Sequence, residues 1–338
     1  MKKRSVALIV LALALGAGAV FWFLAQVPLV ATDSPPSGPR GTEAVAPAAQ
    51  SETDNTPSKG SAASAKKKTA PETLKIASYN IQSFGRTKIG RSGTLKVLAN
   101  IGASFDVMAV QEVGSNASSA SDETADAVMA LYVAKINEHV VGELFDYVRT
   151  GQFALVYRKD RLTVNAWGEY TGVEQFAYKP LIVYFKTLEA PFDFVFIDAH
   201  LRPSQAKTEM KALKRVMAEA AALYDEKDVI CAGDFNADGT YYEEGTSSFP
   251  ADFTYPEFIS VIPNDADTTV ASGSFAYDRM ELTSSMASDF SGNWSVLKPA
   301  SLWDLSFCEG TANNAGTESA LSDHYPIWAE FYTGRDTD

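Results

Sequence analysis

The chain has 338 residues, of which 46% are hydrophobic, so it can support a sizeable core in one large domain or two ordinary ones. The formal net charge is −13. Residues 1–70 hold 8 basic and 4 acidic residues, which leaves 21 basic and 38 acidic residues, a net charge of −17, for residues 71–338. A domain this acidic lacks the basic patch of a tight nucleic-acid binder. Chemistry on phosphate groups is not excluded, since divalent cations can bridge an acidic protein and a phosphate.

The N-terminal segment has the pattern of a membrane anchor. A basic start, Met1–Arg4, precedes an uncharged apolar run over residues 6–30, in which Gln26 is the only strongly polar residue. The run is longer than the apolar part of a typical signal peptide and long enough to cross the ~30 Å hydrocarbon core. We therefore expect residues 1–30 to be a single-pass anchor, with the rest of the chain extracytoplasmic at the cell envelope. Cleavage of a signal near Ala31, which would release a secreted protein, is the alternative.

Residues 31–73 are rich in Ala, Ser, Thr, Pro and Gly and contain almost no large apolar side chains. Such a composition cannot bury enough surface to fold, so we expect a disordered linker. The three lysines at 66–68 are expected to be solvated, with weak contact to an anionic surface as the alternative. The folded domain is expected to span residues 74–333.

From residue 74 onward, apolar segments with strand-like and helix-like periodicity follow one another. The pattern predicts strands over 74–79, 105–110, 153–157, 162–167, 181–187, 192–199, 229–232, 277–282 and 325–331. It predicts helices over 91–103, 122–139 and 204–224, the last with Ser204 as its N-cap. Strands with interspersed helices indicate an α/β domain.

The two cysteines give little guidance on their own. Cys231 lies inside an apolar strand and is most simply a small core residue. A disulfide between Cys231 and Cys308 is possible, and the sequence leaves this open. No Cys/His spacing indicates a zinc site.

The stretch from Asp228 to Asp238 is the most informative in the chain. An apolar strand ends at Gly233, and Asp234 and Asn236 follow two residues apart. Because side chains alternate along a strand, an i, i+2 pair points to one side. A carboxylate there could orient water or a metal, and an amide could donate to a phosphate oxygen. The alternative is a strand that ends in an ordinary Asx turn.

Polar residues recur at the other predicted strand ends. Loops at strand ends carry the functional residues of layered α/β folds, because the strands fix their positions. His139, in the polar tail of a helix, is left without a functional role. The recurring set is Asn80, Glu112, His200, Asp234 with Asn236, Asp278, and Asp323 with His324.

As an ordered set, these stretches resemble the endonuclease/exonuclease/phosphatase superfamily, and more narrowly its deoxyribonuclease I-like branch. The matching segments are LKIASYNIQSFG (74–85), VQEV (110–113), AHLRP (199–203), GDFNAD (233–238), DTT…AYDR (267–279) and LSDHYP (321–326). They cover nearly the whole predicted domain. The resemblance implies an α/β fold: a four-layer α/β/β/α sandwich of two packed mixed β-sheets with helices outside.

The resemblance also implies divalent-metal-dependent hydrolysis of a phosphodiester, with Mg²⁺ or Mn²⁺. Glu112 would be the main metal ligand, with Asn80 and Asp323 near it. Asp234 would orient or activate the attacking water, and Asn236 would donate to the scissile phosphate. Asn80 is also a candidate contact to the substrate.

Both remaining histidines would be catalytic by the same resemblance. His324 would be paired with Asp278, and His200 would be the second catalytic histidine. A metal, amides and imidazoles suit a reaction that gathers negative charge on phosphate oxygens. An imidazole titrates near neutral pH and can therefore move a proton there.

Several positions depart from the family pattern. The carboxylate that would partner His200 falls on Gly151, so another group must take over or the ring is less well oriented. Three arginines that would read DNA correspond to Gln82, Gly114 and Lys179, which leaves Lys179 as the remaining basic candidate for substrate binding. These losses weaken the expectation of minor-groove binding more than that of hydrolysis.

Two structural features near the expected site, a loop disulfide and a Ca²⁺ site, also differ from the family pattern. The positions of the family's loop disulfide are Gly239 and Phe275. Asp267 and Thr269 keep part of a structural Ca²⁺ site, but Gly273 replaces a ligand threonine, so we expect a weakened dependence on Ca²⁺.

The functional expectation is an endonuclease that hydrolyses DNA by in-line attack of water, tethered to the membrane by its N-terminal segment. One alternative is a phospholipid or inositol-phosphate hydrolase of the same superfamily, and a second is a non-catalytic binding module on this fold. The sequence implies no protein partner.

Overall fold

The computed structural model describes residues 72–114, 122–142, 144–242 and 256–336. The expected anchor over residues 1–30 and nearly all of the expected linker over residues 31–73 lie outside these ranges. Among the helices of the described ranges, none is long and apolar enough to cross a membrane.

The first of two six-stranded sheets has the order β11-β12-β1-β2-β4-β3. Its central strands β1 and β2 run parallel, and the remaining neighbours are antiparallel, so the sheet is mixed. Its strands are β1 (Thr73–Phe84), β2 (Val107–Val113), β3 (Phe145–Thr150), β4 (Phe153–Arg158), β11 (Phe290–Val296) and β12 (Ile327–Tyr332).

The second sheet has the order β5-β6-β7-β8-β10-β9 and the same design. Its central strands β7 and β8 are parallel, and their neighbours are antiparallel. Its strands are β5 (Leu162–Glu169), β6 (Leu181–Thr187), β7 (Asp193–His200), β8 (Val229–Asp234), β9 (Phe258–Ser260) and β10 (Asp278–Thr283).

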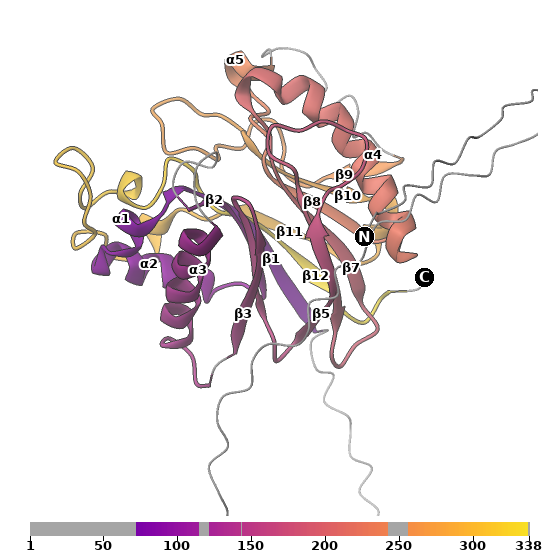
Figure 1. Ribbon diagram of the computed structural model, residues 1–338, viewed down its shortest axis with the longest axis horizontal. Helices are drawn as coiled ribbons and strands as arrows, with labels where there is room; N and C mark the ends of the chain where they lie inside the picture. The colour runs from indigo at the N-terminus through magenta and orange to yellow at the C-terminus, as the bar shows by residue number, and fades with distance from the viewer. Residues whose placement is uncertain (1–71, 115–121, 143, 243–255, 337–338) are drawn as a thin grey trace, which may run out of the picture. The chain divides into compact units, whose positions relative to one another are not determined.

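Helices cover the outer faces of the two sheets, which completes four layers (Figure 1). On the first sheet lie α2 and α3, and on the second lies α4, which runs along β7 and β8. The helices are α1 (Arg86–Ile89), α2 (Ser92–Gly102), α3 (Asp122–Asn137), α4 (Ala206–Tyr224) and α5 (Gly239–Tyr242). The predicted α/β/β/α sandwich is therefore confirmed.

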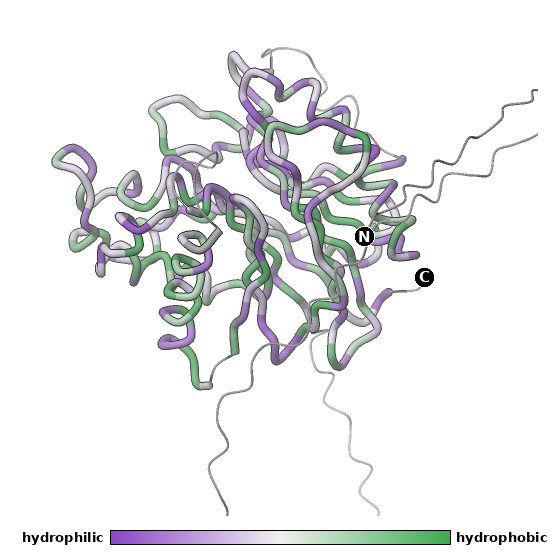
Figure 2. Tube along the Cα trace, viewed as in Figure 1, coloured by the Kyte–Doolittle hydropathy of each residue, from purple (hydrophilic) through white to green (hydrophobic). Residues whose placement is uncertain are grey.

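The central strands are buried on both faces, which is why they read as continuous apolar runs. Ile76 of β1 lies in the core between the sheets, and Ala77 beside it packs under the helices. Between the sheets, the rings of Phe185, Phe192 and Phe194 stack on one another with centroids 5.1–5.4 Å apart. Each fully buried ring contributes roughly 1.5–3 kcal/mol. Hydrophobic segments accordingly follow the strands inside the domain (Figure 2).

Some local predictions were wrong. Ser204 does not cap α4, because a 3₁₀ turn over Pro203–Gln205 precedes the helix and Gln205 takes the N-cap position without a side-chain cap. The disulfide that the sequence left open does not form, because Cys231 and Cys308 are both free and belong to the cores under opposite helical layers; Cys231 is the core residue that the sequence favoured. Strands β3, β9 and β11 were not predicted, since their inward residues are mixed with polar ones.

Candidate active site

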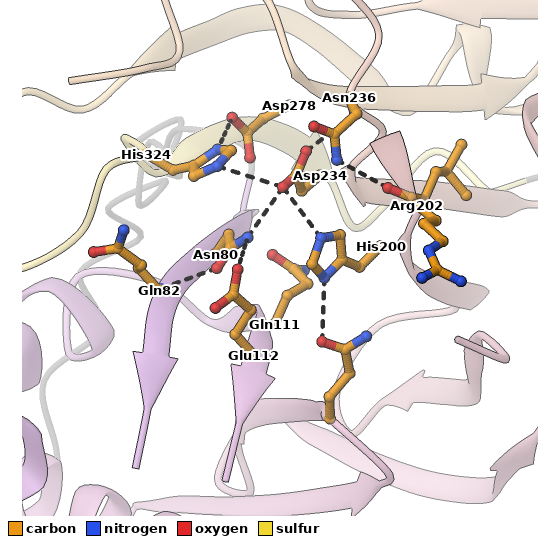
Figure 3. A network of polar contacts seen from close by, with 12 residues as sticks. Asn80, Gln82, Gln111, Glu112, His200, Arg202, Asp234, Asn236, Asp278 and His324 are labelled. Atoms are coloured by element: carbon orange, nitrogen blue, oxygen red, sulfur yellow. Dashed lines mark hydrogen bonds and ion pairs between the residues drawn. The ribbon is translucent and has the colours of Figure 1, made fainter. Parts of the chain in front are cut away.

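The alternation of side chains in the four central strands points the polar strand ends into the seam between the sheets. In β7, Phe194 and Phe196 face that seam, and His200 has the same parity. In β8, Ile230 and Ala232 face it, and Asp234 has the same parity. Ile76 and Asn80 stand in the same relation in β1. The carboxyl ends of parallel strands thus bring side chains from both sheets together (Figure 3).

Asp234 lies at the centre of this cluster and is buried. Its Oδ2 atom accepts a hydrogen bond from Asn80 Nδ2 at 3.0 Å, and it lies 3.4 Å from His324 Nε2 and 3.5 Å from His200 Nε2. Its Oδ1 atom accepts the backbone N–H of Asn236 at 3.0 Å. Burial alone would raise the pKa of Asp234, but the two imidazoles and these hydrogen bonds hold that pKa below its ordinary value.

Gly233 allows Asp234 to be placed there. Its φ of +150° is a backbone conformation that L side chains rarely adopt, and a Cβ atom at this position would lie 1.8 Å from the carbonyl oxygen of Ala199. The close approach sets β8 against β7 directly before the register pair of His200 and Asp234. Asn236 follows with a φ of +47°, a conformation that Asn tolerates better than most residues.

His324 is held between two carboxylates. Its Nδ1 atom lies 2.8 Å from Asp278 Oδ2, and its Nε2 atom faces Asp234. The strand register explains the geometry, because Asp278 pairs with Asp234 across β10 and β8. Burial would lower the pKa of His324, but Asp278 and Asp234 outweigh it and raise this pKa well above its ordinary value. Burial raises the pKa of Asp278. The two carboxylates therefore favour the protonated form of His324, which can donate a hydrogen bond from each ring nitrogen.

His200 is oriented by an amide. Its Nδ1 atom lies 3.1 Å from Gln152 Oε1, and its ring packs against that of Tyr178 with centroids 5.3 Å apart. Gln152 comes directly after Gly151, the position at which the family pattern has a carboxylate that this chain lacks. The ring is therefore supported, and the supporting group is neutral.

Glu112 and Asn80 sit side by side at the ends of β2 and β1. Asn80 Nδ2 donates to Glu112 Oε1 at 3.1 Å, and the backbone N–H of Ser83 donates to Glu112 Oε2 at 2.6 Å. Glu112 has a φ of +62°, which breaks the strand alternation and turns its carboxylate away from the outer face. The Asn80 side chain thus bridges Glu112 and Asp234, the expected metal ligand and the expected water-activating group.

Asp323 comes to the same edge from the loop before β12. Gln82 Nε2 donates to its Oδ2 atom at 2.7 Å, and the side chain is 54% exposed. The ammonium of Lys88 lies behind this edge, bonded to the carbonyls of Ile81, Gln82 and Leu321. Burial lowers the pKa of Lys88 to about 8, against the opposing effect of Asp323 and Glu112. Both carboxylates therefore act on one buried cation.

The oxygen donors at this edge fit a hard divalent cation. Glu112 and Asp323 offer carboxylates, and Asn80 offers an amide oxygen that also accepts the backbone N–H of Gln82 at 3.0 Å. Mg²⁺ is bound in proteins by one or two carboxylates while it keeps several waters. A second group, Asp234, Asp278 and His324, offers ligand atoms within 4.8 Å of one another. We favour the first group, because in the second the donor atoms already contact one another through His324.

Besides Asn80, the other two expected substrate contacts differ in placement. Asn236 is buried beside the cluster, and its Nδ2 donates to the carbonyl of Leu201 at 2.8 Å. The ammonium of Lys179 is instead ion-paired with Glu169 at 3.2 Å, and the Lys179 side chain is 54% exposed.

Sequence reasoning missed the residues that support the cluster from behind. Gln111, beside Glu112, donates through Nε2 to Asp198 at 2.6 Å and to Ser78 at 3.0 Å, which joins the two sheets. The Ser322 hydroxyl donates to the carbonyl of Asn80 at 2.6 Å. The signal for Gln111 and Asp198 was available, since polar residues interrupt otherwise apolar central strands.

Comparison with known proteins agrees with this geometry. The family model described as Endonuclease/Exonuclease/phosphatase family matches residues 77–324. Rabbit (Oryctolagus cuniculus) deoxyribonuclease-1 is 28% identical over 270 residues, which cover 75% of this chain and 91% of that protein. Two solved structures share the fold. A family member from Bacteroides thetaiotaomicron has a TM-score of 0.54 at 16% identity and covers 78% of this chain and 98% of its own. D. rerio TDP2 complexed with single strand DNA product has a TM-score of 0.52 at 15% identity, with 77% and 98% covered.

The sandwich and the cluster at its strand ends define a metal-dependent hydrolase of phosphoric ester bonds. The chain belongs to the Endonuclease/Exonuclease/phosphatase family and to its deoxyribonuclease I-like branch.

Proposed function

We propose that this protein is an endonuclease that hydrolyses DNA phosphodiesters with Mg²⁺ or Mn²⁺. The observation that supports this most strongly is the position of Asp234, whose one carboxylate oxygen faces Asn80, His200 and His324 together. A water at that oxygen would be oriented on the carboxylate and directed between two imidazoles. The similarity to deoxyribonuclease-1 supports DNA as the substrate.

In this mechanism the charged groups of the cluster have separate roles. A cation bound by Glu112 and Asp323 would neutralise the developing charge on the phosphate oxygens. Asp234, held ionised, accepts the proton of the attacking water. The cationic His324 donates a hydrogen bond to a phosphate oxygen, and Asp278 keeps its ring in position.

The remaining polar residues complete the proposed path. His200 extends from β7, where Gln152 fixes its ring, and in its protonated form it would give its proton to the leaving oxygen. The free N–H of the Asn236 amide donates to a non-bridging oxygen. Asn80 holds Glu112 and Asp234 at a fixed spacing, and this spacing places the water in line with the bond to be broken.

The test is a panel of substrates given to the purified full-length chain with Mg²⁺, with Mn²⁺ and with EDTA. Supercoiled plasmid, single-stranded DNA, phosphatidylinositol vesicles and a soluble inositol phosphate would be compared. Nicking of plasmid that requires the metal is expected. Intact DNA together with turnover of a lipid or inositol phosphate would replace this proposal by the second one.

That second proposal, a phospholipid or inositol-phosphate hydrolase, is favoured by one observation. The side chains where DNA-reading arginines were sought do not provide free cations: Gln82 is bonded to Asp323, position 114 is glycine, and Lys179 is paired with Glu169. A non-catalytic binding module is disfavoured by the completeness of the cluster around Asp234.

The proposed location is the cell envelope, with the domain held outside the cytoplasm by residues 1–30. The apolar run after a basic start supports it. Fractionation of cells that express the full chain, followed by protease treatment of intact cells, tests this. Recovery of the whole chain in the cytosol would contradict it.

A further inference from the structure

Asp267, in the loop between β9 and β10, contacts a lysine from the segment after β11, at the place where the family pattern suggests a calcium ion. Lys298 Nζ lies 2.8 Å from Asp267 Oδ2 and 3.3 Å from the backbone carbonyl oxygen of the same residue. The ammonium also lies 3.6 Å from the centre of the Tyr325 ring. Asp267 thus presents a carboxylate and a carbonyl oxygen to one cationic group.

This donor set does not fit a calcium site. Ca²⁺ takes six to eight oxygen ligands, and its affinity follows the number of charged ones. Among the residues that the structure describes, no cluster of three ionisable ligands forms around Asp267. Its single carboxylate is already neutralised by Lys298. Two buried oxygens, Asp267 Oδ1 and Thr269 Oγ1, accept no protein hydrogen bond in the described part, and they are too few and too weakly charged to hold the ion against the lysine.

The loop that Lys298 holds is directly connected to the catalytic cluster. Thr268 accepts the backbone N–H of Asp278 through Oγ1 at 3.1 Å, and its carbonyl accepts the N–H of Tyr325 at 2.8 Å. Thr269 forms a β-bridge with His324. Any shift of this loop would therefore move the His324–Asp278 pair.

We infer that Lys298 is a built-in cation that replaces a structural Ca²⁺ at Asp267 and so positions the His324–Asp278 pair without calcium. An ammonium on a flexible stem can satisfy one carboxylate and one carbonyl as a small cation would. The aromatic face of Tyr325 favours the charge on the other side. The inference does not depend on which phosphoester the protein cleaves.

The test follows thermal unfolding of the full-length chain in millimolar CaCl₂ and in EGTA. The wild type is expected to show the same Ca²⁺ effect on Tm as Asp267→Asn, since neither holds calcium at this loop. Any shift that both share comes from another site and cancels in the comparison. A Ca²⁺-induced rise in Tm that is present in the wild type and lost in Asp267→Asn would overturn the inference.

A second set of variants tests the lysine itself. Lys298→Gln should lower Tm by roughly 3 °C or more, and Lys298→Arg should retain most of the stability. Lys214→Gln is the matched control, because Lys214 also pairs with a carboxylate, Glu257 at 2.5 Å, and lies 5.3 Å from an aromatic ring centre. A loss in Lys298→Gln no larger than in the control would overturn the inference.

Discussion

The Nδ1 atom of His200 lies 3.1 Å from the Oε1 atom of Gln152, and both side chains are buried. A carboxylate in this place would only accept a hydrogen bond and would favour the imidazolium form. An amide carries both a donor and an acceptor, so it can orient the ring in either tautomer without adding charge. The chain therefore keeps a hydrogen-bonding partner for His200, and that partner carries no charge.

The first prediction concerns this contact. Gln152→Glu should keep most of the rate of phosphodiester cleavage, because a carboxylate can accept the same hydrogen bond from Nδ1 of His200. Gln152→Leu should lower the rate of phosphodiester cleavage roughly tenfold through lost orientation. A cleavage rate for Gln152→Leu equal to that of the wild type would argue against the contact.

The second prediction concerns Lys88. Lys88→Met removes the donor to three backbone carbonyls that lie behind Asp323 and Glu112, and it should lower the free energy of unfolding by about 2–4 kcal/mol. It should also weaken activation by Mg²⁺, because the end of β1, beside Asn80, is no longer joined to the loop that carries Asp323. Denaturant unfolding and Mg²⁺ titration of activity measure both effects. Lys96→Met, an exposed lysine on α2, is the control, and an equal response of the two variants would contradict the assigned role.

The third prediction concerns Gly233. Gly233→Ala places a Cβ atom 1.8 Å from the carbonyl of Ala199, and relief requires β7 and β8 to separate beside the catalytic cluster. We expect a destabilisation of roughly 3 kcal/mol or more and loss of hydrolysis. Gly168→Ala in β5 is the control, since no atom lies within 4 Å of its added Cβ. Thermal unfolding of both variants decides the point; similar Tm values would mean that the close approach is not required.

The fourth prediction concerns pH and stability. Burial raises the pKa of Glu281 from 4.5 to about 8, with Ser260 as the hydrogen-bond donor at 2.9 Å. Because the folded-state pKa is the higher one, the stability that Glu281 contributes is fully present below pH 4.5 and is lost as pH rises through about 8. Glutamine at this position does not titrate. Between pH 5 and pH 8 the free energy of unfolding of Glu281→Gln should therefore rise, relative to that of the wild type, by on the order of 1–3 kcal/mol. Denaturant unfolding at both pH values measures this, and parallel pH profiles would refute it.

Much of the site could be predicted from the sequence because strand parity is local information. Asp234 follows Ile230 and Ala232 at even spacing, so the side that carries the apolar core also carries the carboxylate. The same reasoning places Asn80 and His200 in the seam between the sheets. The central strands were found for a similar reason, since burial on both faces leaves an unbroken apolar run.

What the sequence did not reveal depends on backbone and side-chain geometry. Glu112 reaches the cluster only because its positive φ breaks the strand alternation. Gln152 replaces the expected carboxylate from the neighbouring position, and an alignment of residue types cannot show which side chain reaches the ring. Lys298 lies 31 residues from Asp267, and no pattern links the two.

The measurement that tests the central claim most directly is the rate of nicking of supercoiled plasmid by the full-length chain in Mg²⁺, compared with Asp234→Asn, Glu112→Gln and the control Lys96→Met. Both site variants should remain folded, as shown by their Tm, and should nick at least roughly 100-fold more slowly than the wild type. The control should match the wild type, and EDTA should abolish nicking. Wild-type nicking that persists in folded Asp234→Asn and Glu112→Gln would show that this cluster is not the catalytic centre.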